Sequence, residues 1–169
     1  VIAIYFGGLE AELVNSGSIT GTTGVQLASG ASQARVINTG SILANGNFDA
    51  TLDAFEGRGI VVQAINGYVY NGVTGFIGST ATAGGGIFAS ASAGGLVVAN
   101  FGEIVAAFGT GIDLSEVGVG QSVIRVTNSG KVTGSVASFE GSVNADILVN
   151  RGLMVGDVIL GDGADTFDT

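Results

Sequence analysis

The amino-acid sequence predicts an all-β fold: a parallel β-helix solenoid of about six coils, expected to be right-handed, that forms a single domain over residues 1–169. Three observations carry this prediction. A short motif occurs six times, once in degenerate form, apolar residues alternate around the copies, and 31 of the 169 residues are glycine while proline is absent. Alternation with a period of two is typical of strands, and glycine permits a tight backbone corner after each of them.

The repeated motif is an apolar residue, one spacer, Asn, one spacer, Gly, one spacer and an aliphatic residue. It first occupies residues 13–19, and a degenerate copy lies at residues 64–69. The steps between consecutive asparagines are 23, 28, 34, 28 and 22 residues. A shortest step near 22 with longer steps between is what stacked equivalent coils with loop insertions produce. The six asparagines are Asn15, Asn38, Asn66, Asn100, Asn128 and Asn150.

These asparagines are expected to form a ladder along the solenoid. Asparagine tolerates left-handed backbone, and its amide can bond to the same amide one coil away. We interpret the asparagines as structural residues and not as catalytic ones. Six copies at one register describe a scaffold, whereas a reaction centre needs one unique constellation of side chains.

Each coil carries further apolar segments, most of which begin with a glycine, such as residues 24–27 and 59–62. One coil is therefore expected to hold two or three short strands separated by Gly or Asn corners. Residues 45–56 and 78–95 lengthen two of the coils, and we expect them to leave the helix body as loops. The predicted interior side chains are Leu13, Ile19, Val36, Ile42, Val62, Val98, Ile104, Val126, Val132 and Leu148.

The composition excludes several function classes. Hydrophobic residues make up 46% of the chain and charged residues 11%, which argues against disorder. The net charge is −9 with five Lys and Arg, so no basic patch can bind a nucleic acid backbone. Cysteine is absent, which removes disulfides and thiolate sites. Since no apolar run approaches 18 residues and no basic segment precedes the first strand, we expect neither a membrane-spanning helix nor a signal peptide. The chain is expected to be a mature product, a fragment or an excised domain.

The C-terminal segment carries one motif with metal chemistry. Residues 161–167 fit Gly-x-Gly-x-Asp-x-large apolar, and they resemble the nonapeptide of the repeat-in-toxin family, whose stacked turns bind Ca²⁺ in a β-roll. By this resemblance, Asp162, Asp165 and the carbonyl of Gly163 would be calcium ligands, and Phe167 would point inward. The family takes its ligands from two successive turns, and this chain supplies one. The alternative is a last corner of the β-helix with solvated aspartates, because a calcium ion needs six or more oxygens.

The wider chain, over residues 11–169, resembles the Asn-x-Gly repeats of large secreted bacterial surface proteins, namely autotransporter passengers and haemagglutinin-type adhesins. The resemblance implies an extracellular or cell-surface protein with a structural or adhesive role. Such a protein would act through self-assembly into a filament or surface layer, or through a contact surface. The partners expected are further copies of the chain stacked end to end, because exposed strand edges template another chain, and host or matrix glycans.

A catalytic role is the alternative from a different class. β-Helices also carry lyase-like and epimerase-like chemistry on polysaccharides, and those sites resemble one another in using a cation to neutralise a uronate beside a basic residue. Here histidine is absent and the five cations are spread along the chain. No spacing in the sequence places a general acid and a general base side by side. We therefore expect no enzyme, and we keep a calcium-dependent β-helix that binds or modifies carbohydrate as the alternative function.

Overall fold

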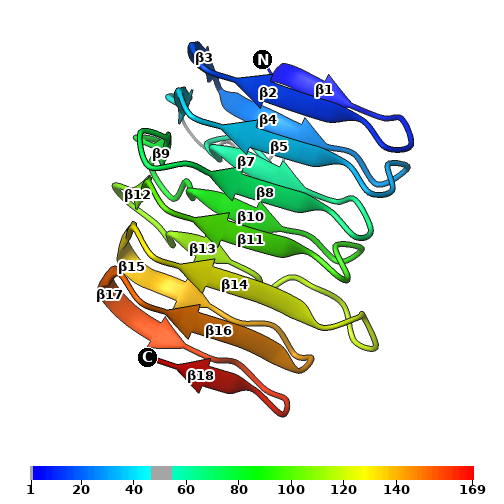
Figure 1. The fold of residues 1–169 in the computed structure, drawn as a ribbon, viewed down its shortest axis with the longest axis vertical. Helices are drawn as coiled ribbons and strands as arrows, with labels where there is room; N and C mark the ends of the chain where they lie inside the picture. The colour runs from blue at the N-terminus through cyan, green and yellow to red at the C-terminus, as the bar shows by residue number, and fades with distance from the viewer. Residues whose placement is uncertain (1, 47–54) are drawn as a thin grey trace.

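The computed structural model describes residues 2–46 and 55–169. The chain winds as a parallel β-helix, with each coil lying on the previous one and the two ends of the chain at opposite ends of the stack (Figure 1). Every strand pair among the described residues is parallel, and these residues form no helix. The predicted fold class is therefore confirmed. No part of the described chain forms a helix that is long and apolar enough to cross a membrane.

One face of the solenoid is a seven-stranded sheet. It holds one strand from each of six coils and one strand from a partial seventh coil. Six of its strands are short because each ends at an asparagine corner, where the chain turns into the next face, and the last one, β18, ends at Asp168. In order along the chain they are β2 (Glu12–Asn15), β5 (Arg35–Asn38), β8 (Tyr68–Asn71), β11 (Val97–Asn100), β14 (Ile124–Asn128), β16 (Asp146–Asn150) and β18 (Thr166–Asp168).

The other two faces belong to one eleven-stranded sheet that bends around a corner. The long strands β15 (Lys131–Glu140) and β17 (Leu153–Ile159) run through both faces, and β15 pairs with β12 at its start and with β13 at its end. One face holds β3 (Ser18–Gly21), β6 (Ser41–Ala44), β9 (Phe76–Ser79) and β12 (Glu103–Ala106). The other holds β1 (Ile2–Phe6), β4 (Thr23–Leu27), β7 (Ile60–Val62), β10 (Ile87–Ala89) and β13 (Ile112–Asp113).

The core runs through the middle of the stack as one continuous cluster of aliphatic side chains. Eight of the ten predicted interior residues are fully or almost fully buried. Leu13 and Ile19 are only partly buried, although they pack against the same cluster. Both lie in the first coil, whose outer side no described coil covers. The eight buried residues are Val36, Ile42, Val62, Val98, Ile104, Val126, Val132 and Leu148.

The expectation of a loop at residues 78–95 is wrong. This segment contains the end of β9 and all of β10, and most of its residues are buried. Its small side chains serve close packing: a Cβ at Gly84 would lie 2.1 Å from the carbonyl oxygen of Gly57, and one at Gly86 would lie 2.5 Å from that of Gly111. Most of the other expected insertion, residues 45–56, lies outside the described residues.

The glycine of the repeated motif is explained by contact between coils. A Cβ at Gly40, Gly102, Gly130 or Gly152 would lie 2.1–2.2 Å from the carbonyl oxygen of a glycine in the preceding coil. None of these four glycines has a positive φ. The motif therefore needs glycine because successive corners stack backbone on backbone, and any side chain would separate the coils.

Candidate functional site

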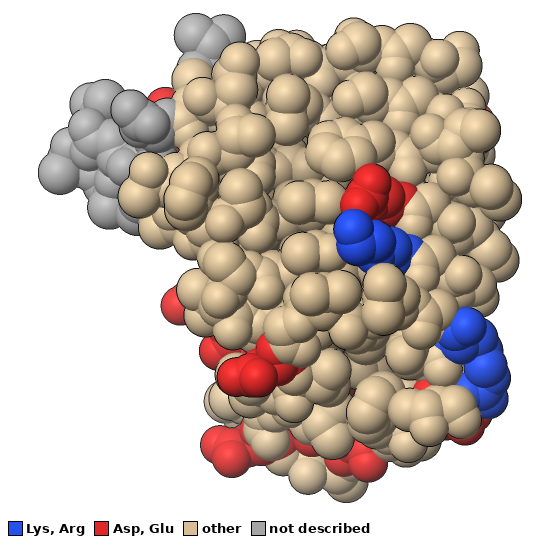
Figure 2. Space-filling view, turned by 90° about the vertical axis from the view of Figure 1, so that its left-hand side faces the viewer, with Lys and Arg blue, Asp and Glu red and all other residues tan. Residues whose placement is uncertain are grey.

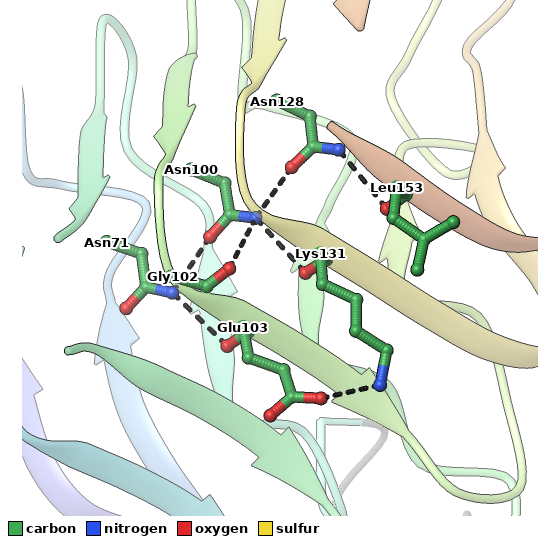
Figure 3. Close-up of polar contacts among 7 residues, drawn as sticks. All are labelled: Asn71, Asn100, Gly102, Glu103, Asn128, Lys131 and Leu153. Atoms are coloured by element: carbon green, nitrogen blue, oxygen red, sulfur yellow. Dashed lines mark hydrogen bonds and ion pairs between the residues drawn. The ribbon is translucent and has the colours of Figure 1, made fainter. Parts of the chain in front are cut away.

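Six asparagines form a continuous ladder at the corner that follows the seven-stranded sheet. Figure 3 shows three of them, Asn71, Asn100 and Asn128. In each rung the Nδ2 of one asparagine donates a hydrogen bond to the Oδ1 of the asparagine in the next coil, at 2.7–2.8 Å. The side chains are buried or nearly so, except that Asn150 at the C-terminal end is half-buried. The ladder residues are Asn15, Asn38, Asn71, Asn100, Asn128 and Asn150.

The prediction that Asn66 belongs to this ladder is wrong, and Asn71 takes its place. Asn71 is the strand partner of Asn38 and Asn100, whereas Asn66 lies in the corner before β8 with φ +54°. The true steps between rungs are 23, 33, 29, 28 and 22 residues. In this coil the motif glycine is Gly75, two positions later than usual, so the Asn-x-Gly spacing is broken at Asn71 and the degenerate copy at residues 64–69 is the nearer match to the motif. The alternation of Val69 and Asn71 was the signal that could have found it.

Each ladder amide also ties the corner backbone together. Asn100 Nδ2 donates to the carbonyl oxygens of Gly102 and Lys131, at 3.3 and 3.2 Å, besides its bond to Asn128 (Figure 3). Asn71 bonds Gly75 and Glu103 in the same way. The amide groups are thus occupied by hydrogen bonds within the fold itself, which suits a structural role.

The surface beside the ladder carries few charges. Figure 2 shows one basic group touching one acidic group near the middle of this face. Beside the ladder, Lys131 Nζ lies 2.8 Å from Glu103 Oε1 (Figure 3). These side chains are 44% and 42% exposed. Exposed pairs of this kind contribute about 0–1 kcal/mol, so this pair orders the surface more than it stabilises the fold.

The C-terminal turn places the residues of the calcium-type motif at the last coil. Asp162 and Gly163 are exposed, and Gly163 has φ +121°. Asp165 is half-buried, and its Oδ1 accepts a hydrogen bond from the backbone N–H of Asp146 at 2.9 Å. Phe167 is the strand partner of the buried Leu148, yet 42% of its surface is exposed because β18 pairs with β16 alone. Within the described ranges, no three or more His, Cys, Asp or Glu side chains lie close enough together to hold a metal ion by themselves.

Asp146 is a further acidic residue at this turn, and it lies outside the calcium-type motif. It is 2% exposed, its Oδ2 accepts a hydrogen bond from the Ser142 N–H at 2.6 Å, and its Oδ1 is buried with no hydrogen-bond partner among the described residues. Burial raises the pKa of Asp146; hydrogen bonds from Ser142 oppose this shift, and the nearby Asp165 carboxylate adds to it. Its signal in the sequence is a charged residue at a position that is apolar in the neighbouring coil, where its partner is Ile124.

A second candidate site is a surface groove of about 870 Å³ at the corner before the seven-stranded sheet, on the first three coils. We call it the corner groove. Its lining is polar apart from one aromatic ring, and all six side chains are exposed or half-exposed. It is lined by Glu10, Glu12, Gln33, Arg35, Asn66 and Tyr68.

Three lining residues of the corner groove have unusual backbone. Glu10, Gln33 and Asn66 have φ of +55°, +59° and +54°, and they are three of the four non-glycine residues with positive φ in the described chain. This conformation costs an L-residue about 1–2 kcal/mol. The equivalent position of the next coil is Gly95, with φ +71°, so glycine meets the backbone requirement of this corner.

Comparison with known proteins gives no match: no family model fits the chain, and no curated protein or solved structure is significantly similar to it.

Proposed function

We propose that this chain is an extracellular or cell-surface structural or adhesive repeat protein of the bacterial type, which acts without turnover through assembly and through its contact surface. The observation that carries the proposal is a regular solenoid whose first and last described strands each leave one edge unpaired by the described residues. β1, β2 and β3 each pair with one strand, and so do β17 and β18. Unpaired edges are templates for another chain.

Apolar surface at the C-terminal end supports the same proposal. Leu153, Val155, Ile159 and Phe167 are 42–54% exposed in the last two strands. The first coil offers the half-buried side chains of Leu13 and Ile19 at the other end. A contact between the two different ends is heterologous and propagates without closing, so it builds a filament.

Sedimentation velocity over a range of protein concentrations, with electron microscopy of the same samples, tests assembly. Species that grow with concentration and appear as filaments are the expected result. The substitution Ile159→Asp at the open end should reduce assembly. The matched control is Val136→Asp, because Val136 is 60% exposed but lies in β15, inside the stack. A compact monomer at all concentrations would count against assembly.

Calcium binding at the C-terminal turn is the second candidate function, and Asp146 favours it. Its buried Oδ1 lacks a partner, and Asp165 lies against its backbone. These oxygens are the hard donors that Ca²⁺ prefers. We propose that Asp146 and Asp165 would hold the ion together with Asp162 and the Gly163 carbonyl, with water completing the shell. The bound ion would neutralise the buried carboxylate and join the last two coils.

Melting curves with CaCl₂, with MgCl₂ and with a chelator test this site. A ligand at 100 times its dissociation constant stabilises a fold by about 2.7 kcal/mol, so saturating Ca²⁺ should raise the melting temperature by several degrees. The substitution Asp165→Asn should remove this gain, and Asp113→Asn, in β13 and away from the turn, should keep it. Equal melting curves with and without Ca²⁺ would exclude the site.

A further inference from the structure

The corner groove has one wall whose backbone is already fixed by the fold. The N–H groups of Glu10, Gln33 and Asn66 donate to the carbonyl oxygens of Ser32, Ile65 and Gly94 in the next coil, at 2.8–3.0 Å. These bonds hold the corner whatever side chain stands there. Gly95 fills the same position in the fourth coil, so glycine satisfies the backbone there. The presence of a side chain on strained backbone in the first three coils therefore needs a reason other than backbone geometry.

These three side chains project from the corner as a row with free polar groups. Glu10, Gln33 and Asn66 are exposed, and in the described chain no side-chain hydrogen bond links them to another residue. Adjacent coils lie about 4.8 Å apart, so the row presents a carboxylate and two carboxamides at a regular spacing. A Cβ at Gly95 would lie 2.3 Å from Asn66 Oδ1, so the glycine leaves room for this amide at the end of the row.

The other wall is ordered by its own contacts. Glu12, Arg35 and Tyr68 are strand partners on β2, β5 and β8. The Arg35 guanidinium lies 5.3 Å from the centre of the Tyr68 ring, and Arg35 Nε lies 3.8 Å from Glu12 Oε2. Cation–π and ionic contacts limit the rotamers of these side chains, so the ring and the donors are set before a ligand arrives.

We propose that the corner groove binds a neutral oligosaccharide, and this inference rests on the proposed adhesive role, to which it gives a ligand class. An aromatic ring packs against the C–H face of a pyranose, while carboxylates, carboxamides and a guanidinium match the donors and acceptors of sugar hydroxyls. Two glutamates face one arginine in the groove, and the chain carries −9 overall. This charge repels uronates, phosphates and nucleic acids and accepts a neutral chain.

Isothermal titration with maltotetraose, cellotetraose and N-acetylchitotetraose, and with tetragalacturonate as the acidic probe, tests the proposal. At least one neutral probe should bind, and the acidic one should not. The substitution Tyr68→Ala should weaken binding about tenfold or more, as expected for loss of an aromatic anchor. Tyr70→Ala is the matched control, because Tyr70 lies two residues further along β8, outside the groove, against Phe101.

Glycine substitutions separate a loss of glycan binding from a loss of folding. The double substitution Gln33→Gly and Asn66→Gly suits the positive φ of both positions, so the protein should melt no lower than the wild type while neutral glycan binding is lost. Binding that survives this variant and Tyr68→Ala, a preference for the uronate, or no binding of any neutral probe would overturn the inference. Sedimentation of the same samples separates the two proposals: a protein that assembles but binds no glycan refutes the groove alone, and one that binds without assembling refutes assembly.

Discussion

At the scale of single residues, position within the coil decides what an asparagine does. Asn71 ends β8, where its amide meets Asn38 and Asn100 inside the stack. Asn66, five residues earlier, lies at an exposed corner in left-handed backbone. Both properties belong to asparagine in general, since its amide is donor and acceptor and it tolerates positive φ. Sequence composition around each residue cannot separate the two roles, and the register between coils can.

Removing a central rung should therefore be costly. In Asn100→Ala, the amide of Asn71 and the Oδ1 of Asn128 each lose a buried partner. An unsatisfied buried polar group costs about 1–3 kcal/mol, so we expect the free energy of unfolding to fall by about 2–4 kcal/mol in chemical denaturation. The matched control is Asn66→Gly, which removes an amide outside the ladder at a position that favours glycine. Equal loss in the two variants would contradict a structural ladder.

Asp146 should make stability depend on pH in the direction opposite to an ion-paired carboxylate. Burial, with the nearby Asp165 charge, raises its pKa in the folded chain above the ordinary value of 3.8. The folded state therefore binds the proton more tightly than the unfolded state, and the ionised carboxylate destabilises the folded state at neutral pH. As pH falls from neutral through the raised pKa towards the ordinary value, this carboxyl should add stability.

Melting curves in a chelator, measured at steps of pH, test this prediction by difference. The wild type should gain stability over that pH window relative to Asp146→Asn, which cannot titrate. Asp162→Asn serves as the control because its side chain is exposed at the adjacent turn. Parallel pH profiles for the wild type and Asp146→Asn would show that the buried carboxyl does not control stability here.

At the scale of strands and corners, much of the fold could be predicted because each coil repeats the same physical requirements. Period-two alternation located the strands of the seven-stranded sheet in five of the six coils. The prediction was wrong in the third coil because two extra residues separate Asn71 from Gly75. This break in the spacing made Asn66 look like the motif asparagine. The prediction of a loop at residues 78–95 was wrong for another reason. Gly, Ala and Ser indicate a flexible loop in most chains, whereas here they let neighbouring coils approach within backbone contact distance.

The candidate sites could be predicted less well than the strands. The C-terminal turn carries its own motif, but Asp146 joins it through stacking, which no local spacing encodes. The corner groove likewise combines residues from three coils, 56 positions apart between Glu10 and Asn66. Such sites depend on the register between coils, and one misplaced rung is enough to hide them.

Corner glycines give the sharpest test at this scale. A Cβ at Gly130 would lie 2.1 Å from the carbonyl oxygen of Gly102, while a Cβ at Gly17 would meet nothing within 4 Å. The two residues hold the same motif position in different coils. Gly130→Ala should lower the free energy of unfolding by about 1–3 kcal/mol or more, because backbone must shift to make room.

Gly17→Ala should be neutral or slightly stabilising, since it restricts the unfolded chain without a clash. Chemical denaturation of both variants under one set of conditions measures the difference. If the two substitutions cost the same, the glycine is needed for backbone freedom and not for the contact between coils.

At the scale of the whole molecule, the charges of the two ends are not complementary. The last coil carries Asp157, Asp162, Asp165 and Asp168 with one cation, Arg151, which pairs with Asp168 at 2.7 Å. Figure 2 shows acidic side chains gathered at this end of the stack. The first coil carries Glu10 and Glu12. In the proposed assembly, apolar edges would favour end-to-end contact, while electrostatic repulsion would oppose it.

Assembly should consequently depend on salt. Raising NaCl from about 0.01 M to about 1 M shortens the Debye length from about 30 Å to about 3 Å, which screens the acidic ends and leaves the apolar contact intact. We expect larger species in sedimentation velocity at high salt, and the substitution Asp157→Asn should lower the salt needed. Glu116→Gln removes the same charge from an exposed position between β13 and β14, so it should leave the transition in place. Association that weakens as salt rises would instead mean that ion pairs, and not apolar strand edges, hold the copies together.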